Sequence, residues 1–340
     1  MSERRFLVGT YTTQRASQGL YLCTMDAAGR IDVLDACPLP DPSFVVLHPR
    51  LPLAYAVNET PDDPGGLSVI AIVDARLVAR QRVSSGGHLP CHLALLADAS
   101  ALAVAHYGCG TVGVFALDDH GRLTGDGYSR RHEGASVHPR RQASAHPHCV
   151  AVGAHGAYVT DLGQDCIVRY AGAPLVEASR CRIHAGAGPR HLCLDEARGV
   201  GWLSNELDNT VSRLRVAADG SLHELDWVST LPDGFAGRSA VSEIARHPNG
   251  RWLYVGNRGH DSLAWYRIGA DGALSLFGRV STQGRHPRHF ALTADGTVLV
   301  AANRDSDSLV AFSVDPERGQ PQPLAQPFSG IAAPVGVRWL

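Results

Sequence analysis

Arginine, glutamate and histidine recur at two fixed places in a repeated pattern of this chain. Pro-Arg-His opens an apolar segment at Pro189–His191 and again at Pro287–His289, and Asn-Glu closes another at Asn205–Glu206. A guanidinium group offers a planar fork that matches phosphate or carboxylate oxygens. A carboxylate or a neutral imidazole can act as a general base. These residue types therefore predict proton-transfer chemistry on a small, oxygen-rich anion.

The segments that carry these residues have the pattern of short β-strands. Each is rich in Val, Leu or Trp, and Asp, Asn, Gly or Arg separates it from the next. In the clearest unit, Gly186–Ser229, strands are predicted at Arg190–Leu194, Gly201–Asn205, Val211–Val216 and Leu222–Val228. Units of this kind begin every 42 to 57 residues. Four strands with such a period are typical of a β-propeller.

The two ends of the chain complete the last of these units. Six units lie inside the chain, PVGVRWL at the C-terminus matches a lone first strand, and FLVGTYT, GLYLCTMD and RIDVLDA near the N-terminus match the other three. Joining them would close a ring and cover edges that are otherwise open to pairing. The prediction is an all-β, seven-bladed β-propeller with four antiparallel strands per blade, forming one domain over residues 1–340.

In a propeller the first strand of each blade lines the central channel, and the second strand runs antiparallel to it. The start of every first strand and the end of every second strand therefore lie at the same mouth of the channel. The residues expected there are Glu59, His92, His106, Tyr107, His148, Arg190, His191, Glu206, Glu243, Arg258, Arg288, His289 and Arg304.

One insertion interrupts the repeat, at Tyr128–His146 between the fourth strand of one unit and the first strand of the next. Loops of this length in compact domains are usually functional or disordered. Its histidines lack the spacing of a metal site, so a solvated loop is expected, one that brings Arg141 and Gln142 over the channel mouth.

Composition excludes several classes of partner. A net charge of −2 argues against nucleic acid and against a membrane surface as partners.

No apolar run approaches 18 residues and the first residues do not have the pattern of a signal peptide, so a cytoplasmic location is expected. The eight cysteines are scattered. No metal or cofactor is predicted, and a closed ring is compatible with a monomer or a weak homodimer.

The chain resembles, end to end, the lactonase family of seven-bladed propellers, which includes bacterial 6-phosphogluconolactonases and eukaryotic 3-carboxy-cis,cis-muconate lactonizing enzymes. The segments that carry the resemblance are VGTYT (8–12), DPSF (41–44), AVNE (56–59), LPCHLAL (89–95), Arg141-Gln142, HPHCV (146–150), DLGQD (161–165), GAGPRH (186–191), NEL (205–207), SEI (242–244), YVGNRG (254–259) and HPRHF (286–290). Two positions depart from it, because the family usually has Asn where Asp41 and His106 stand.

The resemblance implies an active site of His148, Arg190, Glu206 and Arg258. In lactone hydrolysis, Glu206 or His148 would take a proton from the attacking water, while Arg190 and Arg258 hold the oxyanion. The residues expected to bind the small anionic lactone are Arg288, His191, Glu243, Arg141, His92 and Glu59.

Several functions are compatible with these residues. The leading one is hydrolysis of a sugar lactone, with 6-phosphogluconolactone as the first candidate, and an unphosphorylated lactone is the alternative. A muconate-type cycloisomerase would use much the same Arg and His set. A calcium-dependent lactonase is compatible with Glu59, Glu206 and Glu243 sharing one mouth. A non-enzymatic propeller that binds a protein through this mouth is the weakest, because catalytic residue types crowd it.

Overall fold

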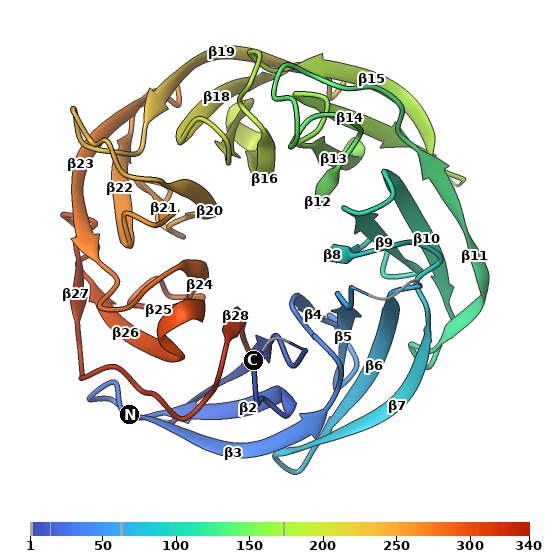
Figure 1. Cartoon of the computed structure of the whole chain (residues 1–340), viewed down its shortest axis with the longest axis vertical. Coiled ribbons are helices and arrows are strands. Elements are labelled where there is room, and N and C mark those ends of the chain that lie inside the picture. Colours follow the sequence, from blue (N-terminus) through green and yellow to red (C-terminus); the bar gives the residue numbers. More distant parts are fainter. Residues whose placement is uncertain (1–2, 14, 62–63, 97, 173) are drawn as a thin grey trace.

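The computed structural model describes residues 3–13, 15–61, 64–96, 98–172 and 174–340. Over these ranges the strands form seven four-stranded antiparallel sheets around a central channel (Figure 1). The predicted seven-bladed β-propeller is therefore confirmed. The two helical segments of the described chain are single 3₁₀ turns, η1 (Glu196–Arg198) and η2 (Arg304–Ser306).

The strands of each blade are given in order from the inner strand to the outer strand. The blades are β28 (Pro334–Trp339), β1 (Arg4–Thr10), β2 (Gly19–Met25) and β3 (Ile31–Pro38); β4 (Val45–Leu47), β5 (Leu53–Asn58), β6 (Gly66–Val73) and β7 (Arg76–Ser84); β8 (Pro90–Leu95), β9 (Ala101–His106), β10 (Thr111–Leu117) and β11 (Leu123–Arg131); β12 (Pro147–Gly153), β13 (Gly156–Asp161), β14 (Cys166–Ala171) and β15 (Val176–Arg182); β16 (Pro189–Asp195), β17 (Val200–Asn205), β18 (Thr210–Val216) and β19 (Leu222–Ser229); β20 (Ala240–Arg246), β21 (Trp252–Arg258), β22 (Ser262–Ile268) and β23 (Leu274–Ser281); and β24 (Pro287–Leu292), β25 (Val298–Asn303), β26 (Ser308–Val314) and β27 (Pro321–Pro323).

The sequence predicts the strands of the clearest unit, Gly186–Ser229, closely. The strands expected over Gly186–Ser229 are β16 to β19, and their ends differ from the prediction by no more than one residue. The insertion was placed less well. The structure assigns its first residues to the outer strand β11, which ends at Arg131, so the irregular loop is only residues 132–146. The periodic apolar pattern marks strand centres well, whereas a polar outer strand such as LTGDGYSRR carries little of that signal.

The ring is closed by the two ends of the chain, as predicted. The inner strand β28 pairs with β1 in antiparallel register from Phe6↔Trp339 to Thr10↔Pro334. Phe6 and Val8 are fully buried and share a core with Val337 and with Val300 of the neighbouring blade. Pairing β28 with β1 removes two open strand edges at once, and this apolar contact holds the closure in place.

The hydrophobic core lies between adjacent blades. Every residue of β2 and β17 is buried, whereas most residues of the outer strands β7 and β15 are exposed. Large side chains such as Trp202 and Tyr266 fill the spaces between neighbouring sheets. Among the described residues, no helix is both long and apolar enough to cross a membrane.

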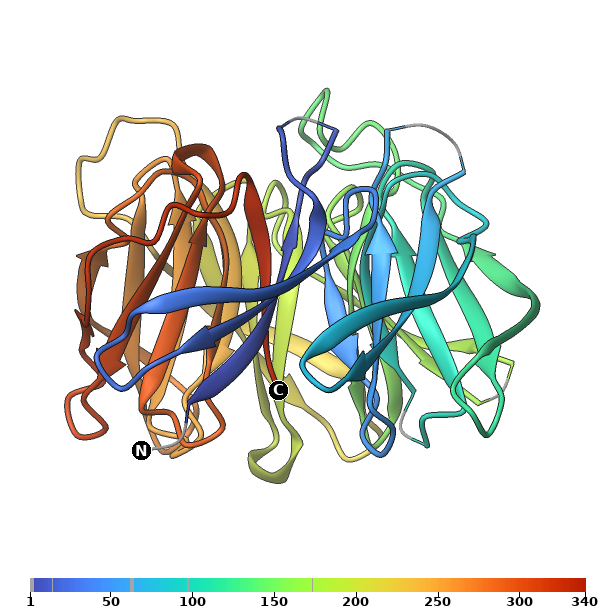
Figure 2. The ribbon, with the colours of Figure 1, turned by 90° about the horizontal axis from the view of Figure 1, so that it is seen from below.

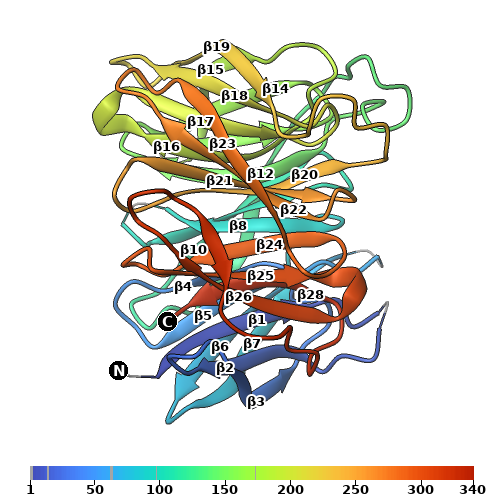
Figure 3. The ribbon, with the colours of Figure 1, turned by 90° about the vertical axis from the view of Figure 1, so that its left-hand side faces the viewer.

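The two faces of the disc differ. Figures 2 and 3 show the two chain ends toward one face, and the loop after β11 and the loop between β19 and β20 projecting from the other. That second face carries the starts of the inner strands and the ends of the strands paired with them. The candidate site lies at this mouth of the channel.

Candidate active site

A β-bulge at the start of the inner strands aims single side chains at the channel mouth. In β16, Pro189 pairs with Asn205 and His191 with Ser204, so Arg190 is the extra residue on its strand. The same register shift occurs at Cys91, His148 and Arg288. A bulge re-aims the side chain of the extra residue away from the regular alternation. Three of the predicted site residues, His148, Arg190 and Arg288, therefore owe their orientation to bulges.

The ends of the second strands contribute through the residue that follows the repeated asparagine. Asn58, Asn205 and Asn257 are themselves fully buried and hydrogen-bond within or between blades, as in Asn205 Nδ2 to Ser212 Oγ at 2.7 Å. The following residues of these blades, which include Glu206 and Arg258, face the mouth.

Two predicted members of the mouth do not belong to it. His106 occupies the asparagine position of its blade, is fully buried, and its Nδ1 lies 3.1 Å from Thr111 Oγ1 on the next strand. Arg304 begins η2 and donates from Nε to its neighbour Asp305 at 2.7 Å. The repeat alignment placed both correctly along the strand, but it could not distinguish a side chain that faces the next strand from one that faces the channel.

Glu206 is the centre of the charged group at the mouth. Its Oε2 lies 2.7 Å from Arg258 Nη2 and 3.1 Å from Arg190 Nε, and its Oε1 accepts a hydrogen bond of 2.5 Å from Arg141 Nη2. His148 Nε2 lies 4.0 Å from Oε2. One carboxylate therefore orients three guanidinium groups that come from two blades and a loop.

Burial and charge set the protonation states of this group. Burial raises the pKa of Glu206, but the positive charges of Arg258 and Arg190 outweigh it, so the pKa lies well below its usual value. Burial lowers the pKa of Arg258 to about 10, and Glu206 opposes the shift. Burial, assisted by the charge of Arg190, holds the pKa of His148 well below its usual value. At neutral pH the site therefore contains an ionised Glu206, charged arginines and a neutral imidazole.

Glycines bring the backbone close enough to build this mouth. The carbonyl oxygen of Gly188 accepts a hydrogen bond of 2.7 Å from the backbone N–H of Glu206. Gly188 has φ of +68°, and a Cβ there would come within 2.4 Å of the Leu207 side chain. Only glycine satisfies both requirements without strain. The Gly-Pro-Arg-His segment thereby fixes the position of the central carboxylate as well as that of Arg190.

The loop at residues 132–146 is solvated over much of its length, as expected, but buried side chains anchor it to the neighbouring blade, which the sequence did not predict. His132 is buried, with Nδ1 2.7 Å from Asp161 Oδ2 and Nε2 2.8 Å from Tyr170 Oη. Gln142 is fully buried and donates to the carbonyl oxygen of Leu162 at 2.9 Å. Its buried histidine and glutamine anchor the loop, whereas its other polar residues are mostly exposed. Sequence polarity alone could not separate the two groups.

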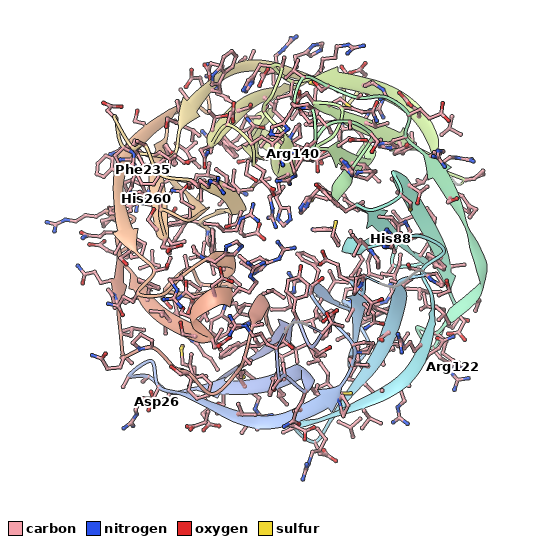
Figure 4. All side chains as sticks on the ribbon, viewed as in Figure 1. Asp26, His88, Arg122, Arg140, Phe235 and His260 are labelled. Carbon is pink, nitrogen blue, oxygen red and sulfur yellow. The ribbon has the colours of Figure 1, made fainter. Side chains whose placement is uncertain are left out.

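This anchored loop places Arg141 over the mouth, as predicted, but Gln142 points into the protein. Besides its bond to Glu206, Arg141 donates from Nη2 to the hydroxyl of Tyr107 at 3.2 Å. Figure 4 labels the preceding residue, Arg140, and shows it toward the channel side of the blade that contains β16. The side chain of Arg141 is 41% exposed, against 5% for Glu206. Arg141 is therefore the outermost guanidinium of the group.

A second charged group lies beside the first. Arg288 Nη2 is 3.6 Å from Glu59 Oε1, and Tyr11 donates its hydroxyl proton to Glu59 Oε2 at 2.8 Å. The Arg288 guanidinium lies 5.2 Å from the centroid of the Tyr11 ring. Burial raises the pKa of Tyr11 above its usual value, so it remains a hydrogen-bond donor. Tyr11 was missed by the sequence reasoning, although it lies within the VGTYT segment.

Asp41, one of the two departures from the family pattern, supports Tyr11. Its fully buried carboxylate accepts hydrogen bonds from the backbone N–H of Thr12 and Thr13, the latter at 2.9 Å. The carboxylate thus fixes the turn that follows Tyr11. A hydrogen-bonding side chain is needed at this position, and aspartate supplies it.

Other predicted residues lie one position deeper in the channel. His92, His191, Glu243 and His289 follow the bulge position, and with Phe44, which was not predicted and stands at the equivalent position of its blade, we call them the inner layer. The rings of His92 and Phe44 are 3.9 Å apart between centroids, and those of His191 and His92 are 5.2 Å apart. Glu243 accepts from His191 Nδ1 at 3.0 Å and from His289 Nε2 at 2.8 Å.

The inner layer changes the interpretation of the three glutamates. Glu206 and Glu59 are each paired with arginine at the mouth, whereas Glu243 lies beneath them and is paired with imidazoles. Among the residues that the structure describes, no group of three or more His, Cys, Asp or Glu could hold a metal ion. The glutamates therefore do not converge as the calcium-dependent alternative requires.

Fold and site together define a seven-bladed β-propeller with a cluster of arginines around Glu206 at one channel mouth. A family model described as "Lactonase, 7-bladed beta-propeller" matches residues 5–339. The chain belongs to this family, and the protein is a lactonase.

Sequence relatives and a similar solved structure agree with this assignment. The chain is 31% identical to the 6-phosphogluconolactonase of Bacillus subtilis over 343 residues, covering 98% of this chain and 97% of the relative. It is 28% identical to the 6-phosphogluconolactonase of Formosa agariphila, covering 94% and 95%. The solved structure of a periplasmic gluconolactonase from Pseudomonas aeruginosa superimposes with a TM-score of 0.93 at 29% identity, covering 100% and 99%.

Proposed function

We propose that the protein hydrolyses 6-phosphogluconolactone to 6-phosphogluconate. The observation that carries the proposal is the charge of the mouth, where Arg141, Arg190, Arg258 and Arg288 are paired with two carboxylates among the described residues, those of Glu59 and Glu206. Counting Glu243 in the layer below still leaves positive charge in excess. A lactone that carries a phosphate dianion would balance it, and guanidinium groups bind phosphate through paired hydrogen bonds. The names of the Bacillus and Formosa relatives support the same substrate.

In the proposed reaction, His148 is the general base. It is neutral at neutral pH, and its buried Nδ1 has no hydrogen-bond partner among the described residues. Glu206 is less suited to act as the base, because three arginines keep its carboxylate ionised and contact both of its oxygens. The buried Nη1 of Arg190 also has no hydrogen-bond partner among the described residues. It can therefore donate to the oxyanion that forms when water attacks the ring carbonyl.

The remaining residues bind the substrate. Arg288, paired with Glu59, and Arg141, paired with Glu206, are assigned to the phosphate. Tyr107 and Tyr11 present hydroxyl groups next to these arginines and are suited to the sugar hydroxyls. His191 and Glu243 were expected to bind the sugar as well, but they hydrogen-bond each other in the inner layer. His92 is also in that layer, and we do not assign it to the substrate.

An unphosphorylated gluconolactone is the second candidate substrate, because the Pseudomonas relative is named a gluconolactonase. A panel of 6-phosphogluconolactone, glucono-δ-lactone and 3-carboxymuconate, corrected for spontaneous hydrolysis, separates the candidates. The proposal requires kcat/KM for the phosphorylated lactone to exceed that for the plain lactone by about tenfold or more. Equal values would favour the plain lactone. Turnover of 3-carboxymuconate alone would make the protein a cycloisomerase.

A further inference from the structure

A histidine behind the candidate site bridges two carboxylates. His184 Nδ1 lies 2.8 Å from Glu224 Oε1, and its Nε2 lies 2.6 Å from Asp208 Oδ2. The three side chains are mostly buried, with exposed fractions of 16% for His184, 11% for Glu224 and 29% for Asp208. An ionised carboxylate only accepts hydrogen bonds, so each ring nitrogen that faces one has to carry a proton. With a carboxylate at each nitrogen, the geometry favours the imidazolium form of His184.

The bridge reaches both sides of Glu206 in the chain. Glu224 accepts a hydrogen bond of 2.5 Å from Ser212 Oγ, which in turn accepts one of 2.7 Å from Asn205 Nδ2. Asn205 ends β17 and directly precedes Glu206, whereas Asp208 follows Glu206 by two residues. One carboxylate of the bridge is thus connected through Ser212 to the residue before Glu206, and the other belongs to the turn that follows it.

His184 itself begins the turn that leads to Arg190. Its carbonyl oxygen accepts from the backbone N–H of Ala187 at 3.3 Å, and the carbonyl oxygen of Ala187 accepts from the backbone N–H of Leu207 at 3.0 Å. The turn before Arg190 and the turn at Glu206 are thus in backbone contact, and the bridge through the imidazole connects them a second time. This contact positions Arg190 and Glu206, whose Nε and Oε2 atoms lie 3.1 Å apart.

Resting on the proposed function, we propose that His184 is a positioning residue for the reaction. As an imidazolium ion it holds the turn before Arg190 against the turn at Glu206, and so keeps Arg190 where it can donate to the oxyanion. Without its second proton the ring has a single N–H, and one of the two carboxylates then faces an unshared electron pair. That repulsion loosens the bridge and shifts Arg190 relative to Glu206. His184 acts through these two residues and takes no part in the chemistry itself.

The surroundings of the ring set the direction of the pH dependence. Burial lowers the pKa of His184, but the hydrogen bonds to Asp208 and Glu224 outweigh it, so the pKa lies above its usual value of 6.5. Among the described residues these two carboxylates are the charged groups in contact with the ring, and the indole of Trp227 stacks on it with 4.0 Å between centroids. Burial raises the pKa of Asp208, so the bridge also weakens in acid. A histidine pKa that is higher in the folded than in the unfolded state contributes its stability below about pH 6.5, and the contribution is lost as the pH rises through the folded-state pKa.

The test compares the pH dependence of kcat in two variants that carry the same substitution. His184→Gln keeps a hydrogen-bond donor but is neutral at every pH. His247→Gln is the matched control, because His247 is also buried but lies in the turn between β20 and β21, at the opposite face of the disc. The substrate is the lactone of the panel that the wild type hydrolyses best, with spontaneous hydrolysis subtracted at each pH.

We expect kcat of the wild type to fall by about tenfold as the pH rises above 6.5, before Arg258 with its pKa of about 10 loses its proton. His184→Gln should have this low kcat already at neutral pH, with no further fall on the alkaline side and with KM little changed. His247→Gln should follow the wild-type profile. A second variant, Asp208→Asn, keeps the shape of the side chain but removes a negative charge from the ring, and should move the alkaline fall in kcat to lower pH by about one unit.

Three results would overturn the proposal. They are a wild-type kcat that does not fall on the alkaline side before the pKa of Arg258, a His184→Gln profile equal to that of the wild type, and an equal loss of kcat in His247→Gln. If His184→Gln folds poorly, Asp208→Asn decides, because an alkaline fall at unchanged pH overturns the proposal and a fall at lower pH supports it. Failure of the proposed function is distinguishable, because in that case the wild-type protein itself hydrolyses no lactone of the panel.

Discussion

Replacing Glu206 with glutamine removes one negative charge from the centre of the arginine group. The carboxylate now contacts Arg258 at 2.7 Å and Arg190 at 3.1 Å, and its other oxygen contacts Arg141. Glutamine has nearly the same shape, but its amide cannot accept from all three guanidinium groups and carries no charge. Among the residues that the structure describes, the variant retains four arginines at the mouth, with Glu59 as the carboxylate still paired with one of them.

The expected loss of stability follows from this geometry. Removing one partner of a buried ion pair costs about 3–5 kcal/mol, because the remaining charge is left uncompensated. The 340-residue chain has an unfolding entropy of roughly 0.7 kcal/mol/K, at ~2.1 cal/mol/K per residue. We therefore expect Glu206→Gln to lower Tm by about 4–7 °C.

Inorganic phosphate should reverse part of this loss. A phosphate dianion can take the place of the missing carboxylate among the arginines, so it should raise the Tm of the variant more than that of the wild type. Thermal unfolding by circular dichroism, with and without phosphate, measures both effects. Glu59→Gln is the matched control, because Glu59 is 3.6 Å from one arginine only; the expected cost is about 1–2 kcal/mol.

The kinetic result completes the prediction. Displaced arginines should lower kcat by about 100-fold, with KM for a phosphorylated lactone unchanged or reduced. Wild-type turnover in Glu206→Gln would remove this residue from the chemistry. A Tm within about 1 °C of the wild type, together with an equal response to phosphate, would refute the ion-pair reasoning.

Three further predictions follow from the same site. Arg288→Ala should raise KM for 6-phosphogluconolactone by about 10–100-fold with kcat nearly unchanged, and leave KM for glucono-δ-lactone unaltered; a kcat effect without a KM effect would contradict its assignment to the phosphate. Because the pKa of His148 lies well below its usual value of about 6.5, the base stays unprotonated through that pH, so kcat/KM should be flat where a normal imidazole would titrate and, as the pH is lowered, fall only in more acidic solution; a decline centred near 6.5 would show a normal imidazole. Activity should persist after dialysis against EDTA, and its loss with recovery on adding Ca²⁺ would establish the calcium-dependent alternative.

The sequence was sufficient for the architecture because the repeat is regular. Most units mark the inner strand with a proline, and four mark the end of the second strand with asparagine; the repeat that these marks define predicts that Arg190, Glu206 and Arg258 share one mouth. Ring closure by Pro334–Trp339 could be predicted because the N-terminal segments lacked a first strand.

The depth of side chains in the channel could not be predicted in this way. A bulge adds one residue to a strand, and nothing in the letters Pro-Arg-His shows that the arginine, and not the histidine, occupies it. His191 and Glu243 were therefore assigned to the substrate, although the structure pairs them in the layer below. The anchoring of Gln142 and His132 depends on partners in another blade, which a local pattern does not reveal.

The bulge at the head of most inner strands has a consequence for protein engineering. The equivalent positions in other blades hold small side chains, at Cys91, Ser242 and Val335. At each of these positions the backbone already has the irregular register that, in β16, directs Arg190 toward the channel mouth. All three side chains are buried, and Ser242 Oγ donates to the carbonyl oxygen of Pro287 in the next blade at 2.7 Å, so a library at these codons that aims to vary the chemistry of the mouth would have to conserve side-chain volume to keep the blades packed.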